Sequence, residues 1–516
     1  MSPELQLAQR LAQAGHFQEM QGVCAQFLQA RAQDVSALLD VGGLLQGYGF
    51  LLMAQQAFEQ ACRHAPQDLR AAINLANVLR DLGEHGEARR LYDGLASKLP
   101  DHPMLRRNLL TGMEYDPDAS DEHRVKQARA WGQWAIERAG GERPRPAAVP
   151  LNGRPLRVGY VSADFCQHTV GLFVKDVIKA HAPQAVAPFA YSAGPVQDWV
   201  TKELRQCCEF RDVRALDDPA LAQLIQDDAI DVLVDLSGHT AGSRLSAFAY
   251  RPAAVMVSWL GYFATTGLRY MDAVVLDEWH APPGMASQFV EPIVSLPGGR
   301  FCYQPVPWAP TDPALPPFER KGHISFGCFN NTAKLNAQVL DTWAGVLKAV
   351  PDARLVLKWR TFNDDTYRRK LTAEFASRGV VPDRLELRGP SFHADLLKEY
   401  ADIDIALDPF PFTGGLTSCE ALWMGVPVVT WPQSRVVSRQ TFAFLSAIGL
   451  AELAAESADD YVGIASALAQ DPARLHTLRS GMRARMQGSP LMDVEGFARR
   501  LEGAFVELFV EMNQPA

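Results

Sequence analysis

The apolar positions of this chain follow two different periods, one before residue 139 and the other beyond Leu156. In the first part they recur at helical spacing, most clearly in AINLANVLRDLGEHGEARRLYDGLASKLP (72–100). Beyond Leu156, short runs rich in β-branched residues alternate with amphipathic segments of helical length. Helical spacing predicts packed helices, whereas the alternation predicts parallel strands covered by helices on both faces.

The helical part contains a repeat of 34 residues, marked by Gly15, Gly49 and Gly83. A glycine lets the chain reverse tightly between two helices, and a pair of alanines at the same interval lets those helices pack closely. The pattern resembles the tetratricopeptide repeat, in about three copies over residues 4–105. Helical hairpins with accidental spacing are the alternative. We expect an all-α repeat region with capping helices over residues 1–139, whose concave face binds protein.

A linker and two α/β lobes are predicted for the rest of the chain. GGERPRPAAVPLNGRP (140–155) is rich in proline and glycine, which is typical of a linker. Strand-like runs then form two series, separated by PVPWAPTDPALPPF (305–318). We therefore expect two facing, doubly wound parallel-sheet lobes over residues 156–310 and 311–516, with a closing C-terminal helix. The runs are RVGYVS, AIDVLVDLS, AAVMVSWLG and DAVVLD, then HISFGCF, ARLVLKW, RLELRG, IDIALD and VPVVTW.

Charge and composition narrow the classes of partner. The formal net charge of −9 argues against nucleic acid, because binding phosphate backbones requires a basic surface. The N-terminus lacks the layout of a signal peptide, and the longest apolar stretch, 253–264, is too short to span a bilayer. The eight cysteines show no zinc-ligand spacing. We expect a cytoplasmic protein with no metal site, no membrane contact and no nucleic-acid partner.

The clearest candidate chemistry lies in IDIALDPFPFTGGLTSCEALWMGVPVVTW. This segment predicts a strand, a glycine loop at Gly414 and Gly415, a helix and a second strand. The free amides at the start of that helix are suited to an anion such as a nucleotide diphosphate. The hydroxyls of Thr417 and Ser418 match phosphate oxygens, and the carboxylate of Glu420 matches a ribose hydroxyl.

Several of these residues also have a purely structural interpretation. Thr417 and Glu420 have the spacing of a capping box, in which both side chains satisfy only amides at the helix end. Lys334 follows the predicted strand in GCFNNTAK and is placed to reach a diphosphate across the cleft. Most lysines in the first turn of a helix are simply solvated. The glycine loop alone is therefore weak evidence for a nucleotide site.

Loops that follow strands of the first lobe supply further candidates. His168, in RVGYVSADFCQHTVG, is suited to orient a substrate or move a proton, or else it forms a hydrogen bond within its loop. Asp235 and His239 follow another strand in DLSGHTAGSR. Asp231 and Asp235 are candidate general bases, although a merely solvated carboxylate fits equally well. Such folds collect functional residues at strand ends.

Five motifs, in this order behind the repeats, together resemble the O-GlcNAc transferase family. They are RVGYVSADFCQH, DVLVDLSGHT, RPAAVMVSWLGYFATTG, FGCFNNTAK and ALDPFPFTGGLTSCEALWMGVPVVT. The family also contains the plant SPINDLY protein O-fucosyltransferases and bacterial cytoplasmic N-glycosyltransferases. The resemblance covers roughly residues 156–510 and the repeats. It implies a GT-B fold and an inverting, metal-independent transfer of a sugar from a nucleotide donor to a Ser or Thr hydroxyl.

The resemblance also implies roles for individual residues. Lys334 matches the lysine that contacts the donor diphosphate, and Asn331 matches a polar residue near the donor. His168 matches the active-site histidine of the first lobe, and His393 matches, with different spacing, a histidine near the nucleotide. Leu416 departs from the family, because O-GlcNAc transferases carry histidine there and many bacterial relatives threonine. The remaining matches, at the phosphates and the ribose, are Thr417, Ser418 and Glu420.

The expected function is transfer of N-acetylglucosamine from UDP-GlcNAc to protein Ser or Thr, with acceptor proteins held by the repeats and no cofactor. FNNTAK and the GHT of DLSGHT are nearer to SPINDLY, so O-fucosylation from GDP-fucose is an alternative, as is N-glycosylation. A GT-B enzyme acting on lipid or glycan acceptors is a first rival. A non-catalytic scaffold, in which the repeats bind partners and the GT-B body has decayed, is a second.

Overall fold

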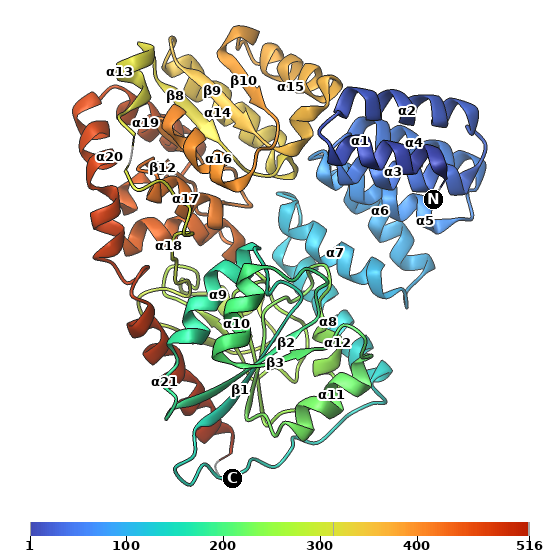
Figure 1. The fold of residues 1–516 in the computed structure, drawn as a ribbon, viewed down its shortest axis with the longest axis vertical. Coiled ribbons are helices and arrows are strands. Elements are labelled where there is room, and N and C mark those ends of the chain that lie inside the picture. The colour runs from blue at the N-terminus through green and yellow to red at the C-terminus, as the bar shows by residue number, and fades with distance from the viewer. Residues whose placement is uncertain (1, 313, 514–516) are drawn as a thin grey trace.

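The N-terminal part of the molecule is an array of helical hairpins, shown in blue in Figure 1; the computed structural model describes residues 2–312 and 314–513. The turns within the first three hairpins contain Gly15, Gly49 and Gly83, whose φ angles are 79°, 90° and 84°. This left-handed backbone favours glycine, which explains why glycine marks the repeat. The helices are α1 (Pro3–Gln13), α2 (Phe17–Ala30), α3 (Val35–Gly47), α4 (Leu51–His64), α5 (Leu69–Asp81), α6 (His85–Lys98), α7 (Pro103–Tyr115) and α8 (Asp121–Arg138).

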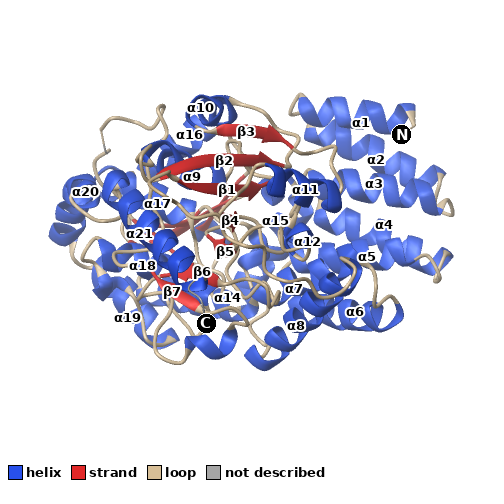
Figure 2. Ribbon diagram, turned by 90° about the horizontal axis from the view of Figure 1, so that it is seen from below, coloured by secondary structure: helices blue, strands red, loops and turns tan. Residues whose placement is uncertain are grey.

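The first α/β lobe contains a seven-stranded parallel sheet in the order β3-β2-β1-β4-β5-β6-β7 (Figure 2). The chain moves outward from β1 to β3 and then returns to the other side of β1, so the strand order reverses between β1 and β4. The strands are β1 (Leu156–Ser162), β2 (Val186–Ser192), β3 (Glu209–Asp212), β4 (Val232–Asp235), β5 (Val255–Trp259), β6 (Ala273–Leu276) and β7 (Ile293–Ser295). The helices are α9 (Thr169–Ala180), α10 (Trp199–Cys207), α11 (Asp218–Asp227) and α12 (Leu245–Phe248).

Three strands of this sheet escaped the sequence analysis. Strand β2 contains Pro188 and alanines in place of a β-branched run, and β3 is a polar, partly exposed edge strand of four residues. Strand β7 at the other edge has only three residues. Short or polar edge strands lack the continuous apolar run that identifies buried parallel strands.

The second lobe contains a five-stranded parallel sheet in the order β10-β9-β8-β11-β12, and here the order reverses between β8 and β11. The molecule is therefore a GT-B fold preceded by a tetratricopeptide-like helical region, as expected. The strands are β8 (Ser325–Cys328), β9 (Arg354–Lys358), β10 (Leu385–Arg388), β11 (Ile405–Leu407) and β12 (Val428–Val429). The helices are α13 (Pro317–Lys321), α14 (Ala337–Ala349), α15 (Asp365–Ser377), α16 (His393–Glu399), α17 (Leu416–Trp423), α18 (Gln440–Ala447), α19 (Ala458–Ala469) and α20 (Pro472–Gln487).

The last helix, α21 (Val494–Met512), leaves the second lobe and packs on the first (Figure 1). The rings of Phe497 and Trp259 stack with their centroids 5.8 Å apart. Glu502 accepts hydrogen bonds from His181 and from the amide of Ala182, both at 2.9 Å. The C-terminal helix therefore ties the two lobes together. No helix among the described residues has the length and apolar character needed to cross a membrane.

The helical region also contacts both lobes, so it is part of the body of the molecule. Helix α8 lies so close to the first lobe that a Cβ on Gly132 would stand 1.9 Å from the carbonyl oxygen of Gly267. On the second lobe, the buried guanidinium of Arg435 donates to the carbonyl oxygens of Met113 and Asp116, at 3.2 and 2.8 Å. The end of α7 is thereby fixed to a loop of the second lobe.

Candidate active site between the lobes

Both points of strand-order reversal open onto one cavity of about 370 Å³. From the first lobe, His168 follows β1 and Thr240 follows β4; from the second, Asn331 and Lys334 follow β8 and Thr417 follows β11. In open α/β sheets, ligands bind outside the carboxyl ends of strands at such points. The cavity is thus the place where this fold is built to bind a ligand.

Lys334 is the cationic centre of this cavity. Its Nζ donates to the side-chain oxygen of Asn330 at 2.9 Å and to the carbonyl oxygen of Thr413 at 2.8 Å. It also lies 4.6 Å from the centre of the Phe412 ring. Burial lowers the pKa of Lys334 to about 8, partly offset by the carboxylate of Asp408. The solvated lysine considered above is therefore wrong, because this ammonium group is held inside the site.

The glycine loop beside Lys334 leaves backbone amides free at the start of α17. The amide of Gly414 donates to Asp408 at 2.6 Å, which holds the loop against the end of β11. The amides of Gly415, Leu416 and Thr417 take no part in the hydrogen bonds recorded between described residues. Unpaired amides and the positive end of a helix dipole favour an anion at this point.

The capping-box interpretation of the loop is wrong. Helix α17 has Gly415 as its N-cap and no capping bond from a side chain. The hydroxyl of Thr417 donates instead to Asn330 at 3.1 Å, and Glu420 lies 2.7 Å from the Nε2 atom of His393. Neither side chain caps the helix: Thr417 lines the cavity, whereas Glu420 is buried in its pair with His393.

Besides Gly414, three of the residues expected to bind the sugar donor do not line the cavity. Ser418 is buried and shares a hydrogen bond of 2.8 Å with the hydroxyl of Thr441. Glu420 and His393 form a pair, and the other ring nitrogen of His393 faces the indole nitrogen of Trp308 at 3.3 Å. Trp308 in turn packs edge-on against Trp199 of the first lobe. These residues form a second polar group near the interlobe boundary.

His168 combines the two interpretations that the sequence left open. It is the N-cap of α9, where its Nδ1 accepts a hydrogen bond of 3.4 Å from the amide of Val170. It also lines the cavity, and half of its side chain is exposed. The carboxylate of Asp164 lies 3.6 Å from the same nitrogen. A cap and a group facing substrate are thus compatible in this residue.

The other acid–base candidates of the first lobe do not reach the cavity. Asp231 precedes β4, at the amino ends of the strands and away from the cavity, where Arg154 forms an ion pair with it at 2.6 Å. Burial raises the pKa of Asp235 to about 7, but its oxygens accept the amides of Ser237 and Gly238. His239 is buried, which lowers its pKa to about 4, and its Nε2 faces the carbonyl of Thr266. These contacts are those of structural residues.

The sequence analysis missed the aromatic part of the cavity. Tyr115, the last residue of α7, lines the cavity and stacks on Phe412 with centroids 4.4 Å apart. Phe263 packs edge-on against Phe412 from the first lobe, at 5.0 Å. The PFPF of the loop after β11 was a visible signal for Phe412. Nothing in the sequence indicated that a residue of the helical region enters the site.

Comparison with known proteins agrees with this geometry. The family model described as glycosyl transferase family 41 matches residues 143–303 and 320–501. The chain belongs to this family. The matched residues include both points of strand-order reversal and every cavity residue of the two lobes discussed above.

Among solved structures, the chain is similar to the O-GlcNAc transferase of Thermobaculum terrenum, with 33% identity, a TM-score of 0.89 and coverage of 100% of this chain and 99% of the other. A probable UDP-N-acetylglucosamine–peptide N-acetylglucosaminyltransferase SPINDLY of Oryza sativa is 36% identical, over 79% of this chain and 44% of the relative. The SEC protein of Arabidopsis thaliana is 29% identical, over 70% and 38%. The chain thus spans less than half the length of these plant relatives.

Proposed function

We propose that this protein transfers a sugar, N-acetylglucosamine in the first instance, from a UDP-linked donor to Ser or Thr of protein acceptors. One observation supports it most: a partly buried ammonium group and the open amides of a helix start face the same interlobe cavity. These two features are complementary to a diphosphate. Membership of glycosyl transferase family 41 makes a nucleotide sugar the natural source of that diphosphate.

The proposed reaction is a single displacement. An acceptor oxygen bonds to the anomeric carbon from the side opposite the donor, while the bond from that carbon to the diphosphate oxygen breaks. The nucleoside diphosphate leaves with the electron pair, and Lys334 and the α17 amides stabilise its new charge. The hydroxyl proton passes to Nδ1 of His168, the ring nitrogen that accepts the Val170 amide and so carries no proton beforehand, and the hydrogen bond from that amide is released. Attack from the opposite side inverts the anomeric centre, and Lys334 takes the role that a metal cation would otherwise fill.

The acceptor is proposed to be a protein because the helical region reaches the cavity itself. Tyr115 of α7 lines the same space as Lys334 and His168, so a chain held along the repeats would lead toward the reacting atoms. A lipid or glycan acceptor would not need this arrangement. The position of Lys334 inside the cavity also argues against a non-catalytic scaffold, because removing an ammonium group from water costs free energy that only a function would justify.

A panel of UDP- and GDP-sugars tests this proposal directly. Calorimetry with the purified protein should show binding of UDP-GlcNAc, and labelled sugar should appear on protein but not in lipid extracts. Preference for GDP-fucose would move the protein to the O-fucosyltransferase alternative, and label on asparagine would indicate N-glycosylation. If no nucleotide sugar binds, the result would favour the alternative of a non-catalytic scaffold.

Substitutions of His168 separate its two roles. Asparagine is a good N-cap but cannot take a proton at neutral pH, so His168→Asn should keep the stability of α9. His168→Ala should lose about 1 kcal/mol of unfolding free energy as well. We expect both variants to lose about a hundredfold in kcat. Urea unfolding and steady-state transfer rates measure the two effects, and full turnover by His168→Asn would reduce this residue to a cap.

A further inference from the structure

The turns of the second and third repeats, at Gly49 and Gly83, lie close to the backbone of the second lobe, whereas the turn of the first repeat does not. A Cβ on Gly83 would lie 2.6 Å from the carbonyl oxygen of Leu335, and one on Gly49 would lie 2.8 Å from that of Arg360. At Gly15, the same position of the first repeat, a Cβ would meet nothing within 4 Å. Glycine at the second and third turns therefore permits a close approach as well as a tight reversal.

The segments that receive these turns carry the candidate site. Leu335 directly follows Lys334, which ends the short 3₁₀ turn η2 (Thr332–Lys334) after β8. Arg360 begins η3 (Arg360–Asn363) after β9, just beyond Trp359 of the cavity wall. The hydroxyl of Thr361 donates to that of Thr332 at 3.0 Å, which joins the two segments. The second and third repeats therefore contact η3 and the end of η2, the two segments next to Lys334.

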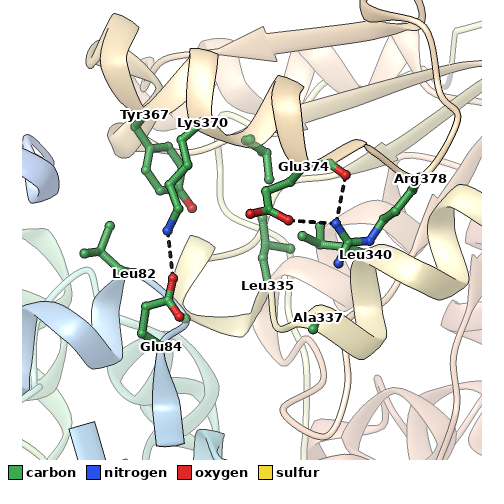
Figure 3. A pocket seen from close by; sticks show the side chains of 11 residues that line it. Leu82, Glu84, Leu335, Ala337, Leu340, Tyr367, Lys370, Glu374 and Arg378 are labelled. Atoms are coloured by element: carbon green, nitrogen blue, oxygen red, sulfur yellow. Dashed lines mark hydrogen bonds and ion pairs between the residues drawn. The ribbon is translucent and has the colours of Figure 1, made fainter. Parts of the chain in front are cut away.

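The junction around Leu335 is not fully packed. A cavity of about 160 Å³ lies between the repeat turn and α14–α15, with Leu82 on one side and Leu335 and Leu340 on the other (Figure 3). One ion pair spans its mouth, from Glu84 of the turn to Lys370 of α15 at 2.8 Å (Figure 3). The close approach of Gly83 therefore adds to the hydrogen bond from the Leu335 amide to the carbonyl oxygen of Thr332, 3.0 Å long, in fixing this backbone.

The helical region reaches the ammonium group from the other side as well. His85, two residues beyond Gly83, stacks on Tyr115 with centroids 6.0 Å apart. Tyr115 stacks on Phe412, and the face of Phe412 supports the Nζ of Lys334. The backbone and the side chain of Lys334 are therefore both held by groups of the third repeat and of α7.

We propose that the turn at residues 82–85 is a positioning element that sets Lys334 for the reaction, which makes the third repeat part of the catalytic unit. The proposal rests on the proposed function for its catalytic readout. Residues of the turn touch no reacting atom and act through Leu335 and Phe412. A protein bound along the repeats would, through the same contacts, bear on the diphosphate site.

Gly83→Ala, with Gly15→Ala as its matched control, tests the proposal. Both substitutions place a side chain at positive φ, but only the first drives it into a carbonyl of the second lobe. Small displacements of catalytic groups cost up to about a hundredfold, so we expect kcat to fall about tenfold or more in Gly83→Ala. The kcat of Gly15→Ala should stay within about twofold of the parent. Equal kcat in the two variants would overturn the proposal.

A second measurement needs no turnover and so separates this proposal from the proposed function. The reactivity of the Lys334 amine toward acetic anhydride, followed by mass spectrometry across pH, reports how the group is held. The titratable groups that act on it, Asp408 and Cys328, are unchanged in both variants. The pH midpoint of Lys334 acetylation should move up toward that of an ordinary lysine in Gly83→Ala only. An unchanged midpoint in Gly83→Ala would contradict the positioning role, even in a protein that binds no nucleotide sugar.

If Gly83→Ala does not fold, exchanging the charges of the ion pair between Glu84 and Lys370 tests the same coupling. Glu84→Lys puts two ammonium groups across the mouth of the junction cavity, and both side chains are exposed enough for the fold to tolerate them. The double variant Glu84→Lys with Lys370→Glu restores the attraction with the charges exchanged. We expect the single variant to move the Lys334 midpoint upward and the double variant to restore it. Single and double variants with the same midpoint would refute the coupling.

Discussion

Lys334→Ala should lower kcat by about 10²–10³ while the protein stays folded. Removing one preorganised group that stabilises developing charge costs this much in other enzymes. In the proposed reaction the loss removes the cation that faces the departing diphosphate, and the amides at the start of α17 remain. Single-turnover transfer rates with saturating donor measure the effect, and unfolding by urea checks the fold. Turnover near that of the parent would remove Lys334 from the reaction.

The pH dependence of the parent protein provides the control for this interpretation. Burial lowers the pKa of Lys334 to about 8, so its charged form is present below that pH and is lost as pH rises through it. We expect kcat/KM to decline tenfold per pH unit above about 8. In Lys334→Arg the guanidinium stays charged, so the residual activity should lose this alkaline limb. An alkaline limb that persists in Lys334→Arg would assign it to another group.

The second lobe shows what the sequence can and cannot predict about a site. The glycine loop, Lys334 and Thr417 were found because buried parallel strands give clear apolar runs, and the residues just after such runs meet at one edge of the sheet. Whether Thr417 caps a helix or faces a ligand could not be decided from spacing. That depended on Asn330, which follows β8 as Lys334 does and contacts both Lys334 and Thr417, the latter from beyond β11.

The first lobe shows the opposite limit. Asp231 precedes β4 and Asp235 is its last residue, so the strand places the two carboxylates at its opposite ends. A pattern that marks the strand only approximately therefore cannot say which carboxylate faces the cleft. Tyr115 was missed for a related reason, because its place in the cavity comes from the packing of α7 between lobes far away in sequence.

The docking of α8 on the first lobe makes a large loss of stability the expected result of Gly132→Ala. Gly→Ala in an exposed helix usually stabilises a protein by about 0.5–1 kcal/mol. At Gly132 the new Cβ would stand 1.9 Å from the Gly267 carbonyl oxygen and 3.0 Å from the Cα of Leu268. Backbone atoms cannot rotate away, so α8 must move off the lobe. We expect a loss of about 3 kcal/mol of unfolding free energy, measured by urea titration.

Gly94→Ala in α6 is the matched control, and its expected effect has the opposite sign. Gly94 is exposed in the middle of a helix, and a Cβ there would meet nothing within 4 Å. The same chemical change should therefore stabilise the protein by about 0.5–1 kcal/mol. Two variants that both stabilise would mean that α8 can leave the lobe at no cost, and the helical region would then be a loosely attached arm. Opposite signs would show that the contact between α8 and the first lobe contributes to stability, as a cavity shared with Tyr115 requires.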